Sequence, residues 1–208
     1  FGSYLGLPDL FDTKTGRSAI GQFGLMDGAG MFAYSGIFPP EPSAWEKLYL
    51  GWVEPITLSS NGTIALPAVG LHTSAKDTIY KIPISTSEYF LVENRNRDPH
   101  NNGQTLLVAD STHQIKTLWF GKDTAGFNQY SISAIKGSVV DVEDFDWALP
   151  GYVDSTHKYD GGGILIWHID ENVIAENRMT NTVNAQMNLR GVDLEEADGS
   201  QDIGQAYG

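Results

Sequence analysis

The stretch GGGILIWHID, residues 161–170, is the clearest structural signal in the chain. An apolar run preceded by glycines and closed by an acidic residue is typical of a buried strand, which we expect to end at Asp170. The next residues, ENVIAENRM (171–179), predict a short helix. Because Gly161-Gly162-Gly163 lead into a strand rather than a helix, they do not have the pattern of a phosphate-binding loop.

Residues 56–142, upstream of this strand, have the pattern of an antiparallel β region. Two short apolar runs flank Asn61-Gly62, and this dipeptide predicts a β-hairpin. Further strand-like runs are separated by Gly, Asn and Asp: TIYKIPIS, EYFLVENR, QTLLVAD, IKTLWF and SVVDVE. We interpret the segment at about 96–145 as an insertion into this region.

The first 55 residues combine short helices with glycine-rich loops. Phe1–Leu5 has the pattern of a helix end that is stopped at Gly6. In PSAWEKLYLGW, Ser43 is a candidate N-cap, Glu46 completes a capping box, and Gly51 ends the helix. Between them, GQFGLMDGAGMFAYSG contains too many glycines for regular structure, so we expect a packed irregular loop.

Together these patterns predict an α+β fold with few helices, a mainly antiparallel sheet and long irregular loops. The length of 208 residues suits one domain or a large piece of one. We divide it into a first region (1–55), a β-rich region (56–150), and a strand followed by an acidic tail (151–208).

Composition narrows the possible partners. The net charge is −13, from 26 acidic and 13 basic residues, which argues against nucleic acid because phosphate contacts need a basic surface. The acidity is explained either by solubility or by binding of divalent cations.

The chain has no cysteine, so disulfides, thiolate zinc sites and cysteine nucleophiles are excluded. No apolar stretch reaches the roughly 20 residues of a membrane span, and no signal peptide is recognisable.

The chain begins with a pattern that resembles the second half of the zinc motif H-E-x-x-H-x-x-G-x-x-D. In that motif two histidines one helical turn apart bind zinc, the glutamate activates water, and the glycine turns the chain toward a third ligand. On this alignment Gly6 is the turning glycine and Asp9 the third ligand. The first histidine and the glutamate would precede Phe1, and Ser3 occupies the place of the second histidine.

Several pieces in order extend the likeness: FGSYLGLPDLFDT, FGLMDGAG, PSAWEKLYLGWVEP, YFLVENR, GGGILIWHIDENVI and VDLEEADG. On these pieces the chain resembles the immune inhibitor A-like secreted zinc metalloproteases over nearly its whole length, except at about 96–145. The resemblance implies a metzincin-like C-terminal subdomain, with Met26 in the Met-turn beneath the zinc ligands. It also implies a secreted or cell-surface location, an extracellular protein or peptide as partner, and a place within a larger polypeptide.

Activity does not follow from the resemblance. A serine hydroxyl is a poor zinc ligand compared with imidazole, and three protein ligands are the usual minimum for catalytic zinc. With Ser3 in place of a ligand and no catalytic glutamate, we expect a degenerate site and a pseudo-protease, with no catalytic residue in this chain. The alternative is an active zinc endopeptidase, hydrolysing extracellular protein, when an upstream half supplies His-Glu.

A second candidate site is acidic. Calcium takes six to eight oxygens from carboxylates, carbonyls and amides, and the last third of the chain is rich in such groups. The spacing is not that of an EF-hand, and a solvated acidic loop is the competing interpretation. Asn177 and Asn181 are further oxygen donors, and the candidate calcium ligands are Asp170, Glu171, Asp193, Glu195, Glu196, Asp198 and Asp202.

The remaining candidates have simpler interpretations. We expect Glu93 to pair with Arg95 or another basic residue rather than with a metal. His168, within an apolar strand, fits a hydrogen-bonded core histidine better than a ligand. No two of His72, His100, His113, His157 and His168 form a His-x-x-x-His pair. The chain lacks the G-x-S-x-G elbow of serine hydrolases.

Overall fold

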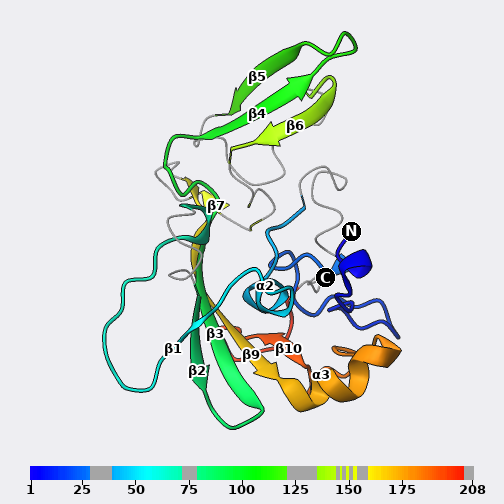
Figure 1. Cartoon of the computed structure of the whole chain (residues 1–208), viewed down its shortest axis with the longest axis vertical. Coiled ribbons are helices and arrows are strands. Elements are labelled where there is room, and N and C mark those ends of the chain that lie inside the picture. Colours follow the sequence, from blue (N-terminus) through cyan, green and yellow to red (C-terminus); the bar gives the residue numbers. More distant parts are fainter. Residues whose placement is uncertain are drawn as a thin grey trace.

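A computed structural model gives the fold of the chain (Figure 1). It describes residues 1–28, 39–71, 79–120, 135–143, 146, 149, 152–153 and 159–203. The fold is α+β, with few helices and mostly antiparallel sheets, as the sequence predicted.

The main sheet has five strands in the order β1-β2-β3-β9-β10. Its centre is the antiparallel pair of β3 (Glu88–Asn96) and β9 (Gly162–Asp170), which runs from Glu88↔Asp170 to Asn96↔Gly162. The other strands are β2 (Ile79–Pro83), antiparallel to β3, β10 (Val192–Leu194), antiparallel to β9, and β1 (Ile56–Thr57), parallel to β2. The sequence stretch 161–170 therefore provides a central strand.

Alternation along β3 and β9 sets the two faces of the sheet. Tyr89, Leu91 and Trp167 point to the covered face and are almost fully buried. On the opposite face Ile164 and Ile166 are 53% and 40% exposed. Residues two apart on a strand share a face, so this single alternation decides where the core lies.

The covered face packs against α2 (Ala44–Tyr49) and α3 (Glu171–Asn177), the latter extended by the 3₁₀ turn η5 (Arg178–Thr180). Both helices begin as expected. Ser43 and Glu46 form a reciprocal capping box, and Asp170, the last residue of β9, caps α3 through the backbone N–H groups of Asn172 and Val173. The short turns η1 (Ser3–Leu5) and η3 (Val69–Leu71) complete the helical elements of the described residues.

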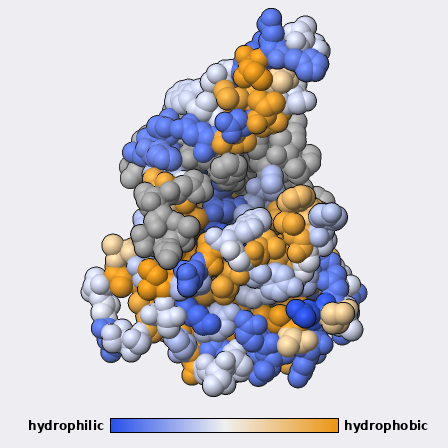
Figure 2. Space-filling model, viewed as in Figure 1, coloured by the Kyte–Doolittle hydropathy of each residue, from blue (hydrophilic) through white to orange (hydrophobic). Residues whose placement is uncertain are grey.

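A second sheet projects from one end of the first (Figure 1). It contains β4 (Gln104–Ala109), β5 (Ile115–Phe120) and β6 (Ser138–Val142) in the order β5-β4-β6, all antiparallel. A small pair, β7 (Tyr152–Val153) and β8 (Tyr159–Asp160), precedes β9. Figure 2 shows hydrophobic atoms on the projecting sheet as well as on the larger part, and on this sheet Ile115 and Val140 are 55% and 52% exposed.

The hairpin predicted at Asn61-Gly62 is wrong. Of the two runs that flank Asn61-Gly62, only Ile56 and Thr57 form a strand. They pair in parallel with β2 instead of with the residues after the glycine. The later segment is held by side chains, because the Tyr80 hydroxyl donates to the Ala65 carbonyl and the Asn94 amide donates to the Leu66 carbonyl. Long-range pairing with the sheet edge thus replaces the local turn.

None of the helices among the described residues has the length and apolar character needed to cross a membrane.

Candidate functional site

The residues singled out for zinc line one cavity of about 420 Å³. The turn η1 carries Ser3, and Gly6 ends this turn in the left-handed conformation, with φ of 92°. A helical turn stopped at Gly6 is what the sequence predicted. Ser3, Gly6 and Asp9 all line the cavity, together with Tyr49, Arg178 and Asn181.

Asp9 is held in place by Asn181. The Asn181 amide nitrogen donates to Asp9 Oδ2 at 2.7 Å, and the Asp9 backbone N–H donates to Asn181 Oδ1 at 2.8 Å. Asn181 lies just after η5 with φ of 54°, and its carbonyl accepts a hydrogen bond from the Thr13 hydroxyl. The Asp9 carboxylate is therefore oriented by a residue 172 positions away in the sequence.

Met26 lies directly against the turn that carries Ser3. It is 8% exposed, and a Cβ added at Gly2 would lie 2.4 Å from its sulfur. Its carbonyl accepts from the Leu10 N–H at 2.8 Å, so Met26 contacts the chain on both sides of the Ser3–Asp9 segment. A glycine at position 2 is needed for this close approach.

Glu46 holds the loop that contains Met26. Its carboxylate accepts from the backbone N–H groups of Leu25 at 3.0 Å and Met26 at 2.8 Å, in addition to closing the capping box with Ser43. Burial raises the pKa of this fully buried carboxyl, although the backbone donors act in the opposite direction. One helix residue thus connects the start of α2 to the Met26 loop.

Glu93 is the centre of a buried ionic network and, as predicted, pairs with basic residues. Its carboxylate lies 3.2 Å from the Lys47 ammonium and 3.3 Å from the Arg95 guanidinium. It also accepts from Trp167 Nε1 at 2.9 Å. Burial alone would raise the pKa of Glu93, but the two cations together hold it below its ordinary value.

The network continues beyond Glu93. Arg95 makes a two-pronged contact with Asp146, at 2.6 Å and 2.7 Å, and Lys47 lies 2.9 Å from Glu41. These contacts join β3 and α2 to Asp146 and Glu41. Every charge in the network has an opposite partner, as buried charges require.

The first two candidate calcium ligands already have structural partners. Asp170 caps α3, and Glu171 accepts from the Tyr89 hydroxyl at 2.6 Å. Burial and the adjacent Glu171 carboxylate both raise the pKa of Tyr89, so its hydroxyl stays protonated and remains a donor.

Three acids of the tail, Asp193, Glu196 and Asp198, also have hydrogen-bond partners within the chain. Asp193 lies 2.7 Å from the Arg190 guanidinium, and its other oxygen accepts from Gln201. Glu196 accepts from the backbone of Asp202 and Ile203, and Asp198 accepts from Ser200. Burial and the neighbouring Asp202 raise the pKa of Glu196. Within the part of the chain that the structure describes, no three His, Asp or Glu side chains are grouped to hold a metal, and calcium stays a prediction.

The structure places His168 differently from the sequence prediction. His168 is on the exposed face of β9, where its Nε2 lies 3.5 Å from Glu88 and its ring lies 5.4 Å from that of Phe90. His168 is therefore half-buried at the surface of the sheet instead of in the core. His72 and His157 lie outside the described residues.

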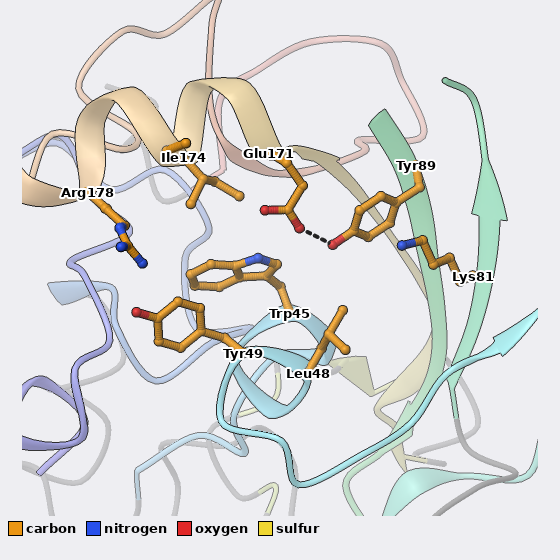
Figure 3. A pocket seen from close by; sticks show the side chains of 9 residues that line it. Trp45, Leu48, Tyr49, Lys81, Tyr89, Glu171, Ile174 and Arg178 are labelled. Carbon is orange, nitrogen blue, oxygen red and sulfur yellow. Dashed lines mark hydrogen bonds between the residues drawn. The ribbon is translucent and has the colours of Figure 1, made fainter. Parts of the chain in front are cut away.

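Sequence reasoning missed a second cavity, of about 480 Å³, between α2, α3 and strands β2 and β3 (Figure 3). Its walls come from four separate elements, so no local motif could have indicated it. Tyr49 and Arg178 line both this cavity and the one that contains Asp9. The two cavities are therefore adjacent. The full lining is Trp45, Leu48, Tyr49, Lys81, Tyr89, Glu171, Ile174, Ala175 and Arg178.

Comparison with known proteins gives no assignment: no protein-family description, no curated protein and no solved structure matches the chain.

Proposed function

We propose that the chain is part of a metalloprotease-like domain that does not hydrolyse peptides by itself. The observation that carries the proposal is the shared cavity of Ser3, Gly6 and Asp9. In the zinc motif that the sequence resembles, these positions carry the second ligand, the turning glycine and the third ligand. The left-handed conformation of Gly6 and the oriented Asp9 carboxylate suit such a pocket, while Ser3 leaves it without an imidazole.

Within this class, the particular family we propose is that of the immune inhibitor A-like secreted peptidases. The sequence pieces that occur in that family's order support this proposal, and so does Met26. Its sulfur packs under Gly2, next to Ser3, which is where a Met-turn residue would be expected. A secreted or cell-surface location, a metzincin-like fold and an extracellular protein or peptide partner belong to the same proposal.

The alternative is an active zinc endopeptidase whose histidine and glutamate come from an upstream half. The Asp9–Asn181 pair and the packing of Met26 against Gly2 support this alternative, because an oriented carboxylate and a methionine beneath it are what a zinc pocket of this kind would need. In that case Asp9 would be a zinc ligand and zinc would activate the attacking water. The chain's own residues would only orient Asp9 and support the base of the pocket.

Elemental analysis of the purified protein, produced together with the residues encoded upstream of Phe1 and dialysed against metal-free buffer, separates the two candidates. We expect no stoichiometric zinc and no hydrolysis of a fluorogenic casein substrate. Zinc at one equivalent, with hydrolysis that a chelator abolishes, would overturn the non-catalytic proposal. The same analysis counts calcium and so tests the acidic residues separately.

A further inference from the structure

The cavity between α2 and α3 combines an apolar wall with two cations. Leu48 and Tyr49 supply the accessible apolar surface, whereas Trp45 and Ile174 also line the cavity but are only 2% and 4% exposed. The Trp45 and Tyr49 rings lie 5.1 Å apart. Figure 3 shows Arg178 on one side of Trp45, and Lys81 beyond Tyr89 on the other. A volume of about 480 Å³ is that of a small-ligand site.

The charges of the cavity are unevenly distributed. At one end Lys81 lies 3.5 Å above the centre of the Tyr89 ring, and Glu171 accepts from the hydroxyl of the same tyrosine. This end therefore carries one positive and one negative group. At the other end no described carboxylate forms an ion pair with Arg178.

From this arrangement we infer that the cavity binds the C-terminal residue of a peptide. Arg178 takes the carboxylate, because a guanidinium presents a planar pair of donors that matches it. The apolar side chain of the same residue lies against Leu48 and the Tyr49 ring, which itself contacts Trp45. The preceding peptide group reaches the end where Lys81 can donate and Glu171 can accept. The C-terminal residue of a peptide carries an anionic group, its carboxylate, and an apolar group, its side chain. The cavity offers a separate partner to each.

This inference rests on the proposed function only in taking a peptide as the partner, and it does not require a bound metal. Arg178 and Tyr49 also line the Asp9 cavity, so a carboxylate at Arg178 would lie where the two cavities meet. Binding can therefore be measured in the presence of a chelator. A failure of the zinc proposal would leave this result unchanged, and the reverse also holds.

The test uses the whole chain, in a chelating buffer, and the indole N–H signals of its five tryptophans. N-acetyl-glycyl-phenylalanine is titrated as the free acid and as the C-terminal amide. We expect the acid to shift the Trp45 indole signal and to bind about fivefold more tightly than the amide, the range of a partly exposed ion pair. A third probe, N-acetyl-phenylalanyl-glutamyl-glycine amide, carries its carboxylate on a side chain.

Two variants identify the group that recognises the carboxylate. Arg178→Gln should reduce the affinity for the acid to that for the amide, and leave the amide unchanged. Lys136→Gln removes one charge from an exposed position outside both cavities and should change neither affinity. Circular dichroism checks that both variants fold, which we expect because both side chains are exposed.

Three results would overturn the inference. The amide could bind as tightly as the acid, or the side-chain carboxylate probe could bind as tightly as the C-terminal one. Alternatively, Arg178→Gln and Lys136→Gln could reduce the affinity equally, which would show that only net charge matters.

Discussion

Replacement of Glu93 by glutamine should destabilise the protein strongly, because it removes the anion from between two buried cations. Glu93 is fully buried and contacts Lys47 and Arg95 at 3.2 Å and 3.3 Å. Loss of one partner of a buried ion pair costs about 3–5 kcal/mol. Both cations keep a second partner here, Lys47 with Glu41 and Arg95 with Asp146, so we expect the lower value, about 3 kcal/mol.

The assay is urea unfolding at neutral pH. With an m-value of about 3 kcal/mol/M, the midpoint should fall by about 1 M. Glu88→Gln is the matched control on the same strand. The Glu88 side chain is 40% exposed, and among the described residues it forms an ion-pair contact only with His168. It should cost less than about 0.5 kcal/mol.

A double-mutant cycle tests the cause. Lys47→Met with Glu93→Gln should cost less than the sum of the two single variants, by at least about 1 kcal/mol, because each single change already removes the Lys47–Glu93 contact and the double variant loses it only once. The reasoning is refuted if Glu93→Gln costs no more than Glu88→Gln, or if the two changes are additive.

Three further predictions rest on contacts at α2 and the Met26 loop. The lowered pKa of Glu93 implies stability that is fully present above the ordinary pKa of about 4.3 and is lost as the pH falls through the folded-state pKa. The stability difference between wild type and Glu93→Gln should therefore shrink in urea titrations below pH 4, and a constant difference would contradict the ion-pair account. Ser43→Ala removes the N-cap hydroxyl that accepts from Glu46, and should lower the free energy of unfolding by about 1 kcal/mol without changing the m-value. Met26→Ala leaves a cavity beneath Gly2 and should cost about 2–4 kcal/mol in thermal or urea unfolding, whereas Met26→Leu should cost less than about 1.5 kcal/mol.

Features determined by neighbouring residues could be predicted from the sequence. The capping box of Ser43 and Glu46 depends on residues three apart, and the strand that ends at Asp170 depends on one apolar run. The α+β class follows from such local patterns. The pairing of Glu93 with Arg95 was accessible for the same reason, since residues two apart on a strand share a face.

Features determined by distant residues could not be predicted. The hairpin at Asn61-Gly62 has a correct turn signal, but the edge of β2 offers a better partner to Ile56 and Thr57. The orientation of Asp9 depends on Asn181, which is 172 residues away in the sequence. Arg95 pairs with Asp146, which follows the strands of the second sheet in the sequence. The cavity lined by Lys81 and Arg178 exists only once four elements have packed together.

The most direct test of the central claim is zinc titration of wild type and Ser3→His, measured by competition with a chromophoric zinc indicator. If Ser3 and Asp9 belong to a metal pocket that has lost an imidazole, Ser3→His should raise the zinc affinity by about tenfold or more. Adding Asp9→Asn to that variant should remove the gain, while Ser3→Ala should behave like wild type. Equal zinc affinities of wild type and Ser3→His, or a gain that persists with Asp9→Asn, would contradict the account.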